Sequence, residues 1–204
     1  MKVIYHCYGG THSSVTAAAI HLGMLPEDRV PGPEEFLQLP LYDRQDACEH
    51  GHIFSIGIDE YGHEVYLTAR RSRPAVLENV FAGLAGIFGV PASSYCLVNA
   101  MSQVNWIMMF GGYLSRRWGL VGVGRPIVTM GTRVAYFKLV GLVKKTKEKL
   151  RADGEKSSLF QQQPLSRGDC CRCYSYRPAP GGERPGRRQF SGAAVFEYAR
   201  RRRG

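Results

Sequence analysis

The hydrophobic and polar positions of residues 1–150 switch between strand-like and helix-like patterns. Residues 2–8 are rich in β-branched and aromatic side chains and predict a buried strand. A helix is predicted at 14–22, with Ser13 or Ser14 available to cap its first turn. Polar residues and prolines then dominate 26–50, where we expect a loop with a short helix near 33–39.

The middle of the chain predicts a hairpin, two helices and a short strand. Residues 52–58 and 63–69 flank the sequence Asp-Glu-Tyr-Gly, which supplies turn geometry between two strand-like runs. A strand is expected at 95–98, and a helix at 104–118 that Gly111 and Gly112 would weaken. Pro74 suits the first position of a helix over 74–88, whose apolar residues recur at helical spacing: Val76, Leu77, Val80, Phe81, Leu84 and Phe88.

The last part of the pattern predicts a strand at 127–130 and a helix that Gly131-Thr132 opens and that ends near Leu150. The lysines at its end suit the negative end of the helix dipole. Strands that alternate with helices indicate an α/β protein: three layers, a mostly parallel sheet with a β-hairpin, Rossmann-like or P-loop-like. Such sheets bind ligands at the carboxyl ends of their strands.

Charge and composition divide the chain at about residue 150. Residues 1–150 carry 15 Lys/Arg against 12 Asp/Glu, whereas 151–204 carry 12 against 5, so most of the net charge of +10 lies in the second part. Residues 151–204 also lack Ile and Met and hold eleven Arg. We therefore predict a single α/β domain at 1–150 and a disordered basic tail at 151–204. The tail composition also matches a shifted reading frame of GC-rich DNA.

The apolar runs bear on cellular location. An apolar share of 44% is ordinary for a globular protein, and no apolar run reaches the roughly 18 residues of a membrane span. The first residues lack the long apolar region of a signal peptide. We expect a cytoplasmic protein with reduced cysteines and no membrane contact.

The stretch HCYGGTHSSVTAAAIHLG, residues 6–23, places a glycine-bearing turn between a strand and a helix. Backbone N–H groups and the helix dipole at such a turn favour an anion. The predicted ligand-binding residues are Gly9, Gly10, Thr11, Ser13 and Ser14. The alternative is a tight turn whose hydroxyls only cap the helix. The turn has neither the Walker A spacing nor a lysine, and it is not a GxGxxG sequence.

A second segment could complete such a site. Thr129-Met130-Gly131-Thr132 repeats the predicted strand–glycine–hydroxyl–helix order, and Arg116 and Arg125 lie nearby in the sequence. If the two loops lie side by side, Thr132 and one of these arginines would contact the same anion. The alternative is ordinary helix ending and capping.

Cys7 is a candidate nucleophile. The stretch around it resembles the phosphate loop of low-molecular-weight tyrosine phosphatases, which have a strand, Cys, five residues, Arg, then Ser or Thr. Cys7 and Ser14 match that pattern, but Ser13 stands at the arginine position. The resemblance implies phosphoryl-transfer or hydrolase chemistry, with His12 able to tune the thiol. Alternatively, Cys7 is a small buried apolar residue.

Cys48, His50 and His52 could bind a metal, but their spacing fits no standard zinc pattern and no fourth ligand is evident, so we expect no metal there.

Residues 1–150 resemble a small bacterial family known as domain of unknown function 3189, found mainly in Gram-positive spore formers. The resemblance lies in HCYGGTHSSVTAAAIHLG, GIDEYGHEVY, NWIMMFGGYLSRRWGL and GRPIVTMGT. It implies a cytoplasmic bacterial protein and brings no activity or cofactor. The first hypothesis is therefore binding of a phosphate-bearing small molecule or nucleotide at the glycine turn. The alternatives are a non-catalytic regulatory or protein-interaction module, and nucleic-acid binding through the basic tail.

Overall fold

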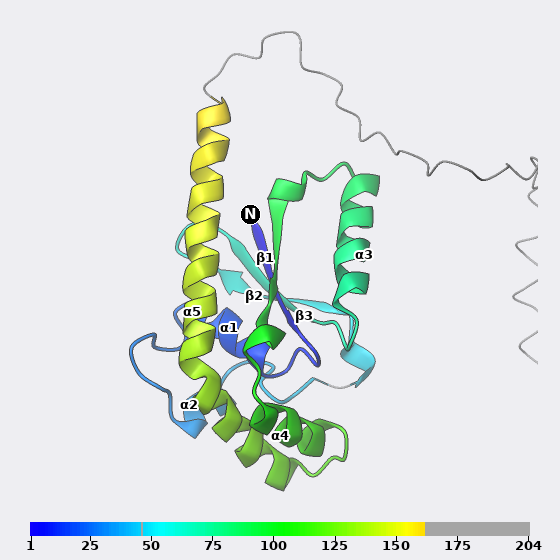
Figure 1. Ribbon diagram of the computed structural model, residues 1–204, viewed down its shortest axis with the longest axis vertical. Helices are drawn as coiled ribbons and strands as arrows, with labels where there is room; N and C mark the ends of the chain where they lie inside the picture. Colours follow the sequence, from blue (N-terminus) through cyan, green and yellow to red (C-terminus); the bar gives the residue numbers. More distant parts are fainter. Residues whose placement is uncertain (46, 162–204) are drawn as a thin grey trace, which may run out of the picture. The chain divides into compact units, whose positions relative to one another are not determined.

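The computed structural model describes residues 1–45 and 47–161, and in this part the chain forms one sheet of four strands (Figure 1). The strands are β1 (Lys2–Cys7), β2 (Ile53–Ile58), β3 (Glu64–Ala69) and β4 (Tyr95–Asn99), in the order β2-β3-β1-β4. β1 is parallel to β3 and β4, and β2 is antiparallel to β3. The predicted α/β class and mostly parallel sheet are confirmed.

The predicted hairpin is also confirmed, and Asp59 explains its turn. The Asp59 Oδ1 atom accepts hydrogen bonds from the backbone N–H groups of Tyr61 at 2.9 Å and His63 at 2.8 Å. Gly62 supplies the positive φ of +79° that the turn needs. The β2–β3 pairing therefore follows from local turn chemistry.

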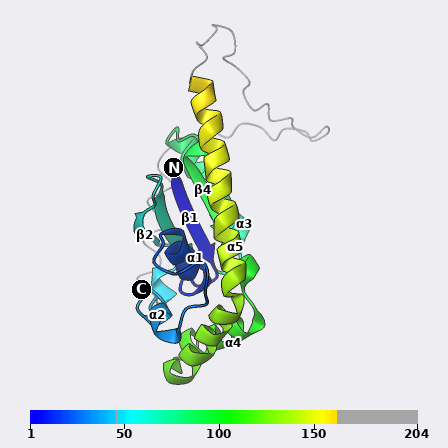
Figure 2. The same ribbon diagram turned by 90° about the vertical axis from the view of Figure 1, so that its left-hand side faces the viewer.

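Helices lie on both sides of the sheet (Figures 1 and 2). α1 (Ser13–His21) and α5 (Val121–Gln161) cover one side together with the short α2 (Pro33–Leu37), and α3 (Pro74–Ile87) lies on the other. α4 (Trp106–Arg116) packs along the first part of α5. Three short 3₁₀ helices complete the order: Ala47–Glu49, Ala92–Ser94 and Ala100–Gln103.

The main core lies between the sheet, α1 and α5. Its largest fully buried side chains include Tyr5, Ile20, Leu67 and Tyr136. α3 differs, because none of its residues is buried. The helix predicted from Pro74 onward is confirmed, but its apolar face is only partly covered: Val76, Val80, Leu84 and Phe88 are 47–73% exposed.

The strand predicted at 127–130 is wrong, and so is the helix start at Gly131-Thr132. These residues lie inside α5, which contains Pro126 and runs from Val121 to Gln161. Three glycines let α4 and α5 approach closely enough to pack this segment as a helix. A Cβ at Gly111, Gly124 or Gly131 would lie only 2.3–2.6 Å from a backbone nitrogen of the facing helix. The β-branched run is helical because it is buried in the α4–α5 contact, and periodicity cannot tell such a run from a buried strand.

α5 continues past the predicted helix end near Leu150, and residues 162–204 of the predicted tail lie outside the described residues. Because no break occurs at Gly131, the Val121–Asp153 part of α5 reaches the length and composition of a membrane span. Half of its most apolar window is buried inside the protein. By length and composition, the core helix of a soluble protein meets the same criterion, and this helix packs against α1 and α4.

Candidate functional site

The glycine loop, residues 9–14, joins the carboxyl end of β1 to the start of α1. Gly10 has a φ of +69°, and a Cβ there would lie 2.6 Å from the Gln45 Oε1 atom. The Gln45 side-chain amide donates to the Gly10 carbonyl oxygen at 2.8 Å. The loop is thus shaped for glycine at this position and is held from one side by the segment that contains Gln45.

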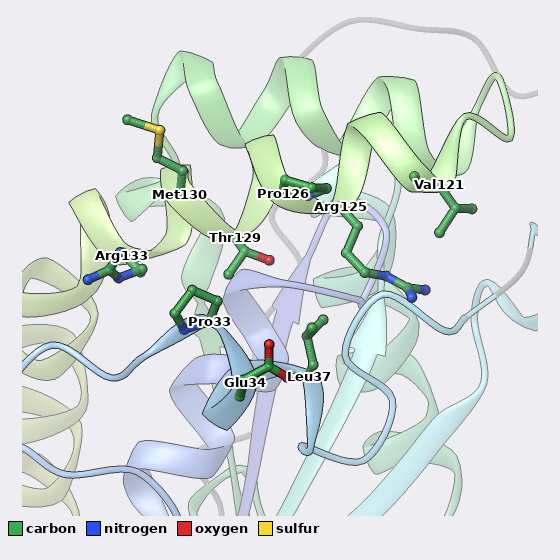
Figure 3. A pocket seen from close by; sticks show the side chains of 10 residues that line it. Pro33, Glu34, Leu37, Val121, Arg125, Pro126, Thr129, Met130 and Arg133 are labelled. Atoms are coloured by element: carbon green, nitrogen blue, oxygen red, sulfur yellow. The ribbon is translucent and has the colours of Figure 1, made fainter.

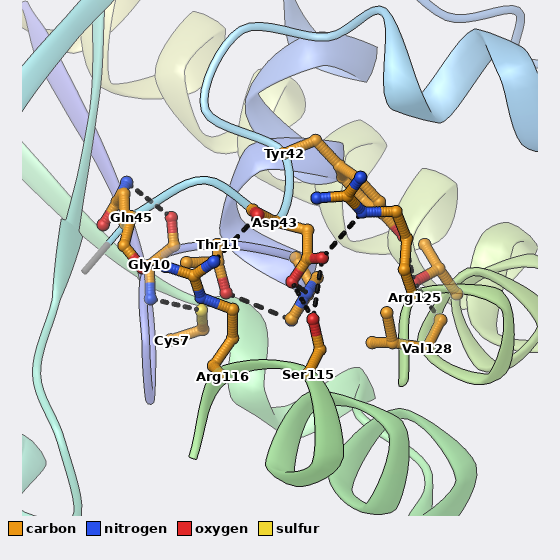
Figure 4. Close-up of polar contacts among 12 residues, drawn as sticks. Cys7, Gly10, Thr11, Tyr42, Asp43, Gln45, Ser115, Arg116, Arg125 and Val128 are labelled. Carbon is orange, nitrogen blue, oxygen red and sulfur yellow. Dashed lines mark hydrogen bonds and ion pairs between the residues drawn. The ribbon is translucent and has the colours of Figure 1, made fainter. Parts of the chain in front are cut away.

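Cys7 lies at the base of the glycine loop and is 5% exposed. Its Sγ atom accepts a hydrogen bond from the Gly10 N–H at 3.1 Å (Figure 4). The same atom lies 3.2 Å from Ser14 Oγ. Two polar groups therefore converge on the sulfur. The Cys7 side chain therefore has polar partners in its buried position.

The start of α1 has no side-chain cap, so the predicted capping by Ser13 or Ser14 is wrong. The N-cap residue is His12, which makes no side-chain cap hydrogen bond, and the first turn contains no acidic residue. Ser13 and Ser14 are buried inside the helix, and the Thr11 Oγ1 atom lies 3.1 Å from His12 Nδ1. Two of the hydroxyls that we expected to meet a ligand, those of Thr11 and Ser14, therefore lie on protein partners.

His12 belongs to a buried charge cluster around Asp43 (Figure 4). The fully buried Asp43 carboxylate lies 3.0 Å from His12 Nε2, accepts from Arg125 Nε at 3.0 Å, and accepts from Ser115 Oγ at 2.8 and 3.0 Å. Burial alone would raise the pKa of Asp43. Hydrogen bonds from His12, Arg125 and Ser115, together with the electrostatic effect of His12, lower this pKa to about 2. The cluster ties α4 and α5 to the glycine loop.

Of the two predicted arginines, both reach this cluster from different helices. Arg125 in α5 pairs with the Asp43 carboxylate, and Arg116 in α4 donates to the Asp43 carbonyl oxygen at 3.1 Å and to the Gln45 carbonyl oxygen. Thr132 is fully buried, donates to the Val128 carbonyl oxygen at 2.8 Å and contacts the Tyr42 hydroxyl at 3.0 Å. Thr132 therefore packs inside α5. It does not belong to a second loop, as we had expected.

Two arginines that the sequence analysis missed lie beside the glycine loop. The backbone N–H groups of Arg70 and Arg71 extend the β1–β3 ladder by donating to the carbonyl oxygens of Cys7 at 3.0 Å and Tyr8 at 2.9 Å. Both arginines directly follow β3, so the rule that ligands bind at carboxyl strand ends could have found them.

The pKa values of two histidines near this edge are lowered, mainly by burial and further by arginines. Burial and the charge of Arg70 lower the pKa of His6 to about 4. Burial lowers the pKa of His50, and the charges of Arg71 and Arg116 lower it further, against a smaller opposing effect of Glu49. Arginines from two different segments thus act on one edge of the sheet.

A separate hollow of about 360 Å³ lies between α2 and α5 (Figure 3). Arg125, Arg133 and Thr129 line it from α5, and Glu34 and Leu37 line it from α2. Arg125 alone connects this hollow to the Asp43 cluster, and none of residues 9–14 lines it. The hollow therefore lies near the glycine loop, but the loop does not form part of its wall.

Two other polar groups do not join the loop. In the described part of the chain, no three His, Cys, Asp or Glu side chains are placed to hold a metal ion. This statement covers Cys48, His50 and His52. At the opposite edge, the buried Asp59 Oδ2 lies 3.0 Å from His21 Nε2, whose Nδ1 lies 2.8 Å from the Tyr5 hydroxyl. This second network joins α1 to the sheet and the hairpin.

Comparison with known proteins identifies the chain at the level of a family. No curated protein and no solved structure matches it. The family described as protein of unknown function (DUF3189) matches residues 2–148, which includes the glycine loop, Asp43, both arginine pairs and most of α5. The protein belongs to this family.

Proposed function

We infer that the protein binds a small phosphate-bearing anion at the carboxyl edge of its sheet, between the glycine loop and the arginines that follow β3. The observation that carries this proposal is that the backbone of Arg70 and Arg71 pairs with Cys7 and Tyr8, just before a glycine loop that leads to an uncapped start of α1 with no acidic residue in its first turn. Backbone N–H groups at a helix start attract anions, and guanidinium groups match the geometry of phosphate oxygens.

The burial of the hydroxyls determines how the anion would be held. Because Ser14 Oγ lies on Cys7 and Thr11 Oγ1 lies on His12, the ligand would be bound by backbone N–H groups of the loop and by arginine. Asp43 does not oppose this, since its carboxylate is already occupied by His12, Arg125 and Ser115. The negative charge of Asp43 is thus balanced inside the protein. The Arg70 side chain donates to Asn99 Oδ1 at 3.4 Å, a contact that the ligand would replace.

The test is a thermal-shift screen of the full chain with phosphate, sulfate, sugar phosphates and nucleotides. A ligand at a hundred times its dissociation constant should add about 2.7 kcal/mol of stability. Arg70→Gln should remove the shift, whereas Arg73→Gln, an exposed arginine three residues away, should keep it. If no anion stabilises a well-folded sample, or if both variants behave alike, the anion site is wrong.

The Cys7–Ser14 contact favours a second candidate function, transfer of the phosphoryl group. The Cys7 sulfur would attack phosphorus and form an S–P bond while the P–O bond to the ester oxygen breaks, and the thiol proton would pass to the leaving oxygen. Water would then break the S–P bond, which releases phosphate and restores the thiol. Because Ser13 stands where the phosphatases carry arginine, Arg70 or Arg116 would have to contact the phosphoryl oxygens.

Turnover of para-nitrophenyl phosphate tests this second candidate. Wild-type turnover that Cys7→Ser abolishes, with phosphate binding retained, would establish it. Phosphate binding by wild type without any turnover would contradict it and leave a non-catalytic binding module.

A further inference from the structure

The α4–α5 end of the molecule carries a large exposed apolar surface, which we call the apolar tip. Figure 1 shows α4 and the first turns of α5 together at one end, beyond the sheet. The side chains that define the tip are all 50–75% exposed and are mostly aromatic: Trp106, Phe110, Tyr113, Trp118, Met130 and Phe137. Single exposed apolar residues need no explanation, but this many large and mostly aromatic side chains on two packed helices favour a surface that another body covers.

The apolar tip belongs to a stretch of the chain that has no acidic residue of its own. The sequence contains no Asp or Glu from residue 79 to residue 147, and the same stretch contains eight Lys and Arg. The carboxylates that reach α5 come from the body of the protein, as in the Asp43–Arg125, Glu27–Lys144 and Glu60–Lys147 pairs. A partner of the tip should therefore present negative charge next to an apolar layer.

This charge argues against a second copy of the chain as that partner. Exposed apolar residues of α5 recur at the 3–4 spacing of a coiled-coil seam through Val123, Met130, Val134 and Phe137. The charged residues that flank this seam are Arg133 and Lys138, both exposed. Pairing two copies along it would bring these like charges together.

We propose that the apolar tip docks on the surface of an anionic lipid bilayer. Tryptophan and tyrosine favour the interface between lipid headgroups and acyl chains, and exposed lysine and arginine beside them are attracted to anionic headgroups. We expected no membrane contact from the lengths of the apolar runs, but a helix pair that lies on a bilayer needs no spanning run. The inference is independent of the anion site, which lies at the glycine loop.

The chain offers a built-in probe of this docking. It contains two tryptophans, Trp106 and Trp118, and both belong to the apolar tip. The full chain is mixed with vesicles of phosphatidylcholine alone, or with about a third phosphatidylserine, and tryptophan emission is recorded. Anionic vesicles should shift the emission to the blue, and brominated acyl chains should quench it. Residues 151–204 contain basic side chains that could hold the chain to vesicles, but they contain no tryptophan. Binding through them alone would therefore give neither the blue shift nor the quenching.

A matched pair of variants locates the contact. The double variant Phe110→Ser, Phe137→Ser keeps both tryptophans. It should raise the lipid concentration that gives half of the emission change about tenfold or more, because two large apolar groups no longer enter lipid. Ile58→Ser, at an apolar position on β2 that is 68% exposed, should bind like wild type. Absence of a blue shift with anionic vesicles would overturn the proposal. It would equally be overturned by a blue shift that appears with protein concentration alone, since a second copy would then cover the tip.

Discussion

Asp43→Asn tests whether the buried charge cluster holds the glycine loop in place. The carboxylate is fully buried and meets His12, Ser115 and Arg125, so the substitution removes its charge while it preserves its shape. An amide NH₂ cannot accept a hydrogen bond, and it would face at least one of these donors.

The lowered pKa of Asp43 sets the size of the electrostatic part. A drop from the ordinary value of 3.8 to about 2 corresponds to about 2 kcal/mol of folding stability at neutral pH. The facing donor groups add about 1–3 kcal/mol of lost hydrogen bonding. Asp43→Asn should therefore lower the free energy of unfolding by about 3–5 kcal/mol at pH 7.

The pH dependence separates the two parts. A carboxylate with a lowered pKa contributes its full stability above the pKa of the unfolded chain and loses it as the pH falls toward 2. The electrostatic deficit of Asp43→Asn should thus shrink to about half at pH 3. Urea unfolding followed by far-ultraviolet circular dichroism, for wild type and variant at pH 7 and pH 3, measures it.

Glu35→Gln is the matched control. The Arg29 hydrogen bond and the Gly32 N–H lower the pKa of Glu35 to about 2 as well, but this pair is exposed to solvent. The control should cost far less, because water screens exposed ion pairs. Equal urea midpoints for Asp43→Asn and wild type at pH 7 would refute the reasoning, and so would a deficit that does not change between pH 7 and pH 3.

Other predictions test the sheet edge, the helix contact and the second polar network. Because burial and Arg70 lower the pKa of His6 to about 4, the wild type should lose about 3 kcal/mol of stability through this histidine as the pH falls from 6.5 to 4, and His6→Leu should remove that loss in urea unfolding at several pH values. Gly131→Ala should lower the free energy of unfolding by about 1–3 kcal/mol, since its Cβ would meet the Met108 backbone. Gly141→Ala, with open space at its Cβ, should raise it by up to about 1 kcal/mol. Calorimetric melting that ranks the two variants the other way would contradict the close packing of α4 on α5. Asp59→Ala should speed hydrogen exchange of the Tyr61 and His63 amides, because both donate to Asp59 Oδ1, and unchanged exchange there would show that the turn forms without it.

Elements set by local chemistry could be predicted from the sequence. The β1–α1 unit, the β2–β3 hairpin with its Asp59-Glu60-Tyr61-Gly62 turn, the helix from Pro74 and the strand at β4 all lie within a few residues of their predicted bounds. Each depends on a period or a turn that a short window contains.

The part that failed depends on contacts between distant residues. The β-branched run near Val128 is helical because Gly111, Gly124 and Gly131 let two helix backbones approach, and no single window shows that pairing. The same glycines suggested a weak helix and a loop when each was considered alone.

The candidate site shows the same division. The glycine loop was visible in the sequence because its residues are consecutive. Asp43 was not, since it lies in a polar loop and its partners Ser115 and Arg125 are 72 and 82 residues away. Arg70 could have been found, because it directly follows a predicted strand that neighbours β1.

The central claim is that the backbone of the glycine loop and the adjacent arginines bind a phosphate group. Titration of the ¹⁵N-labelled full chain with inorganic phosphate, followed by amide NMR spectra, tests it most directly. We predict saturable shifts at the amides of Gly9, Thr11 and Ser13 and at the Arg70 side chain, with the Gly62 amide of the hairpin turn unchanged. Shifts scattered over surface lysines, with the loop amides unmoved, would contradict the account.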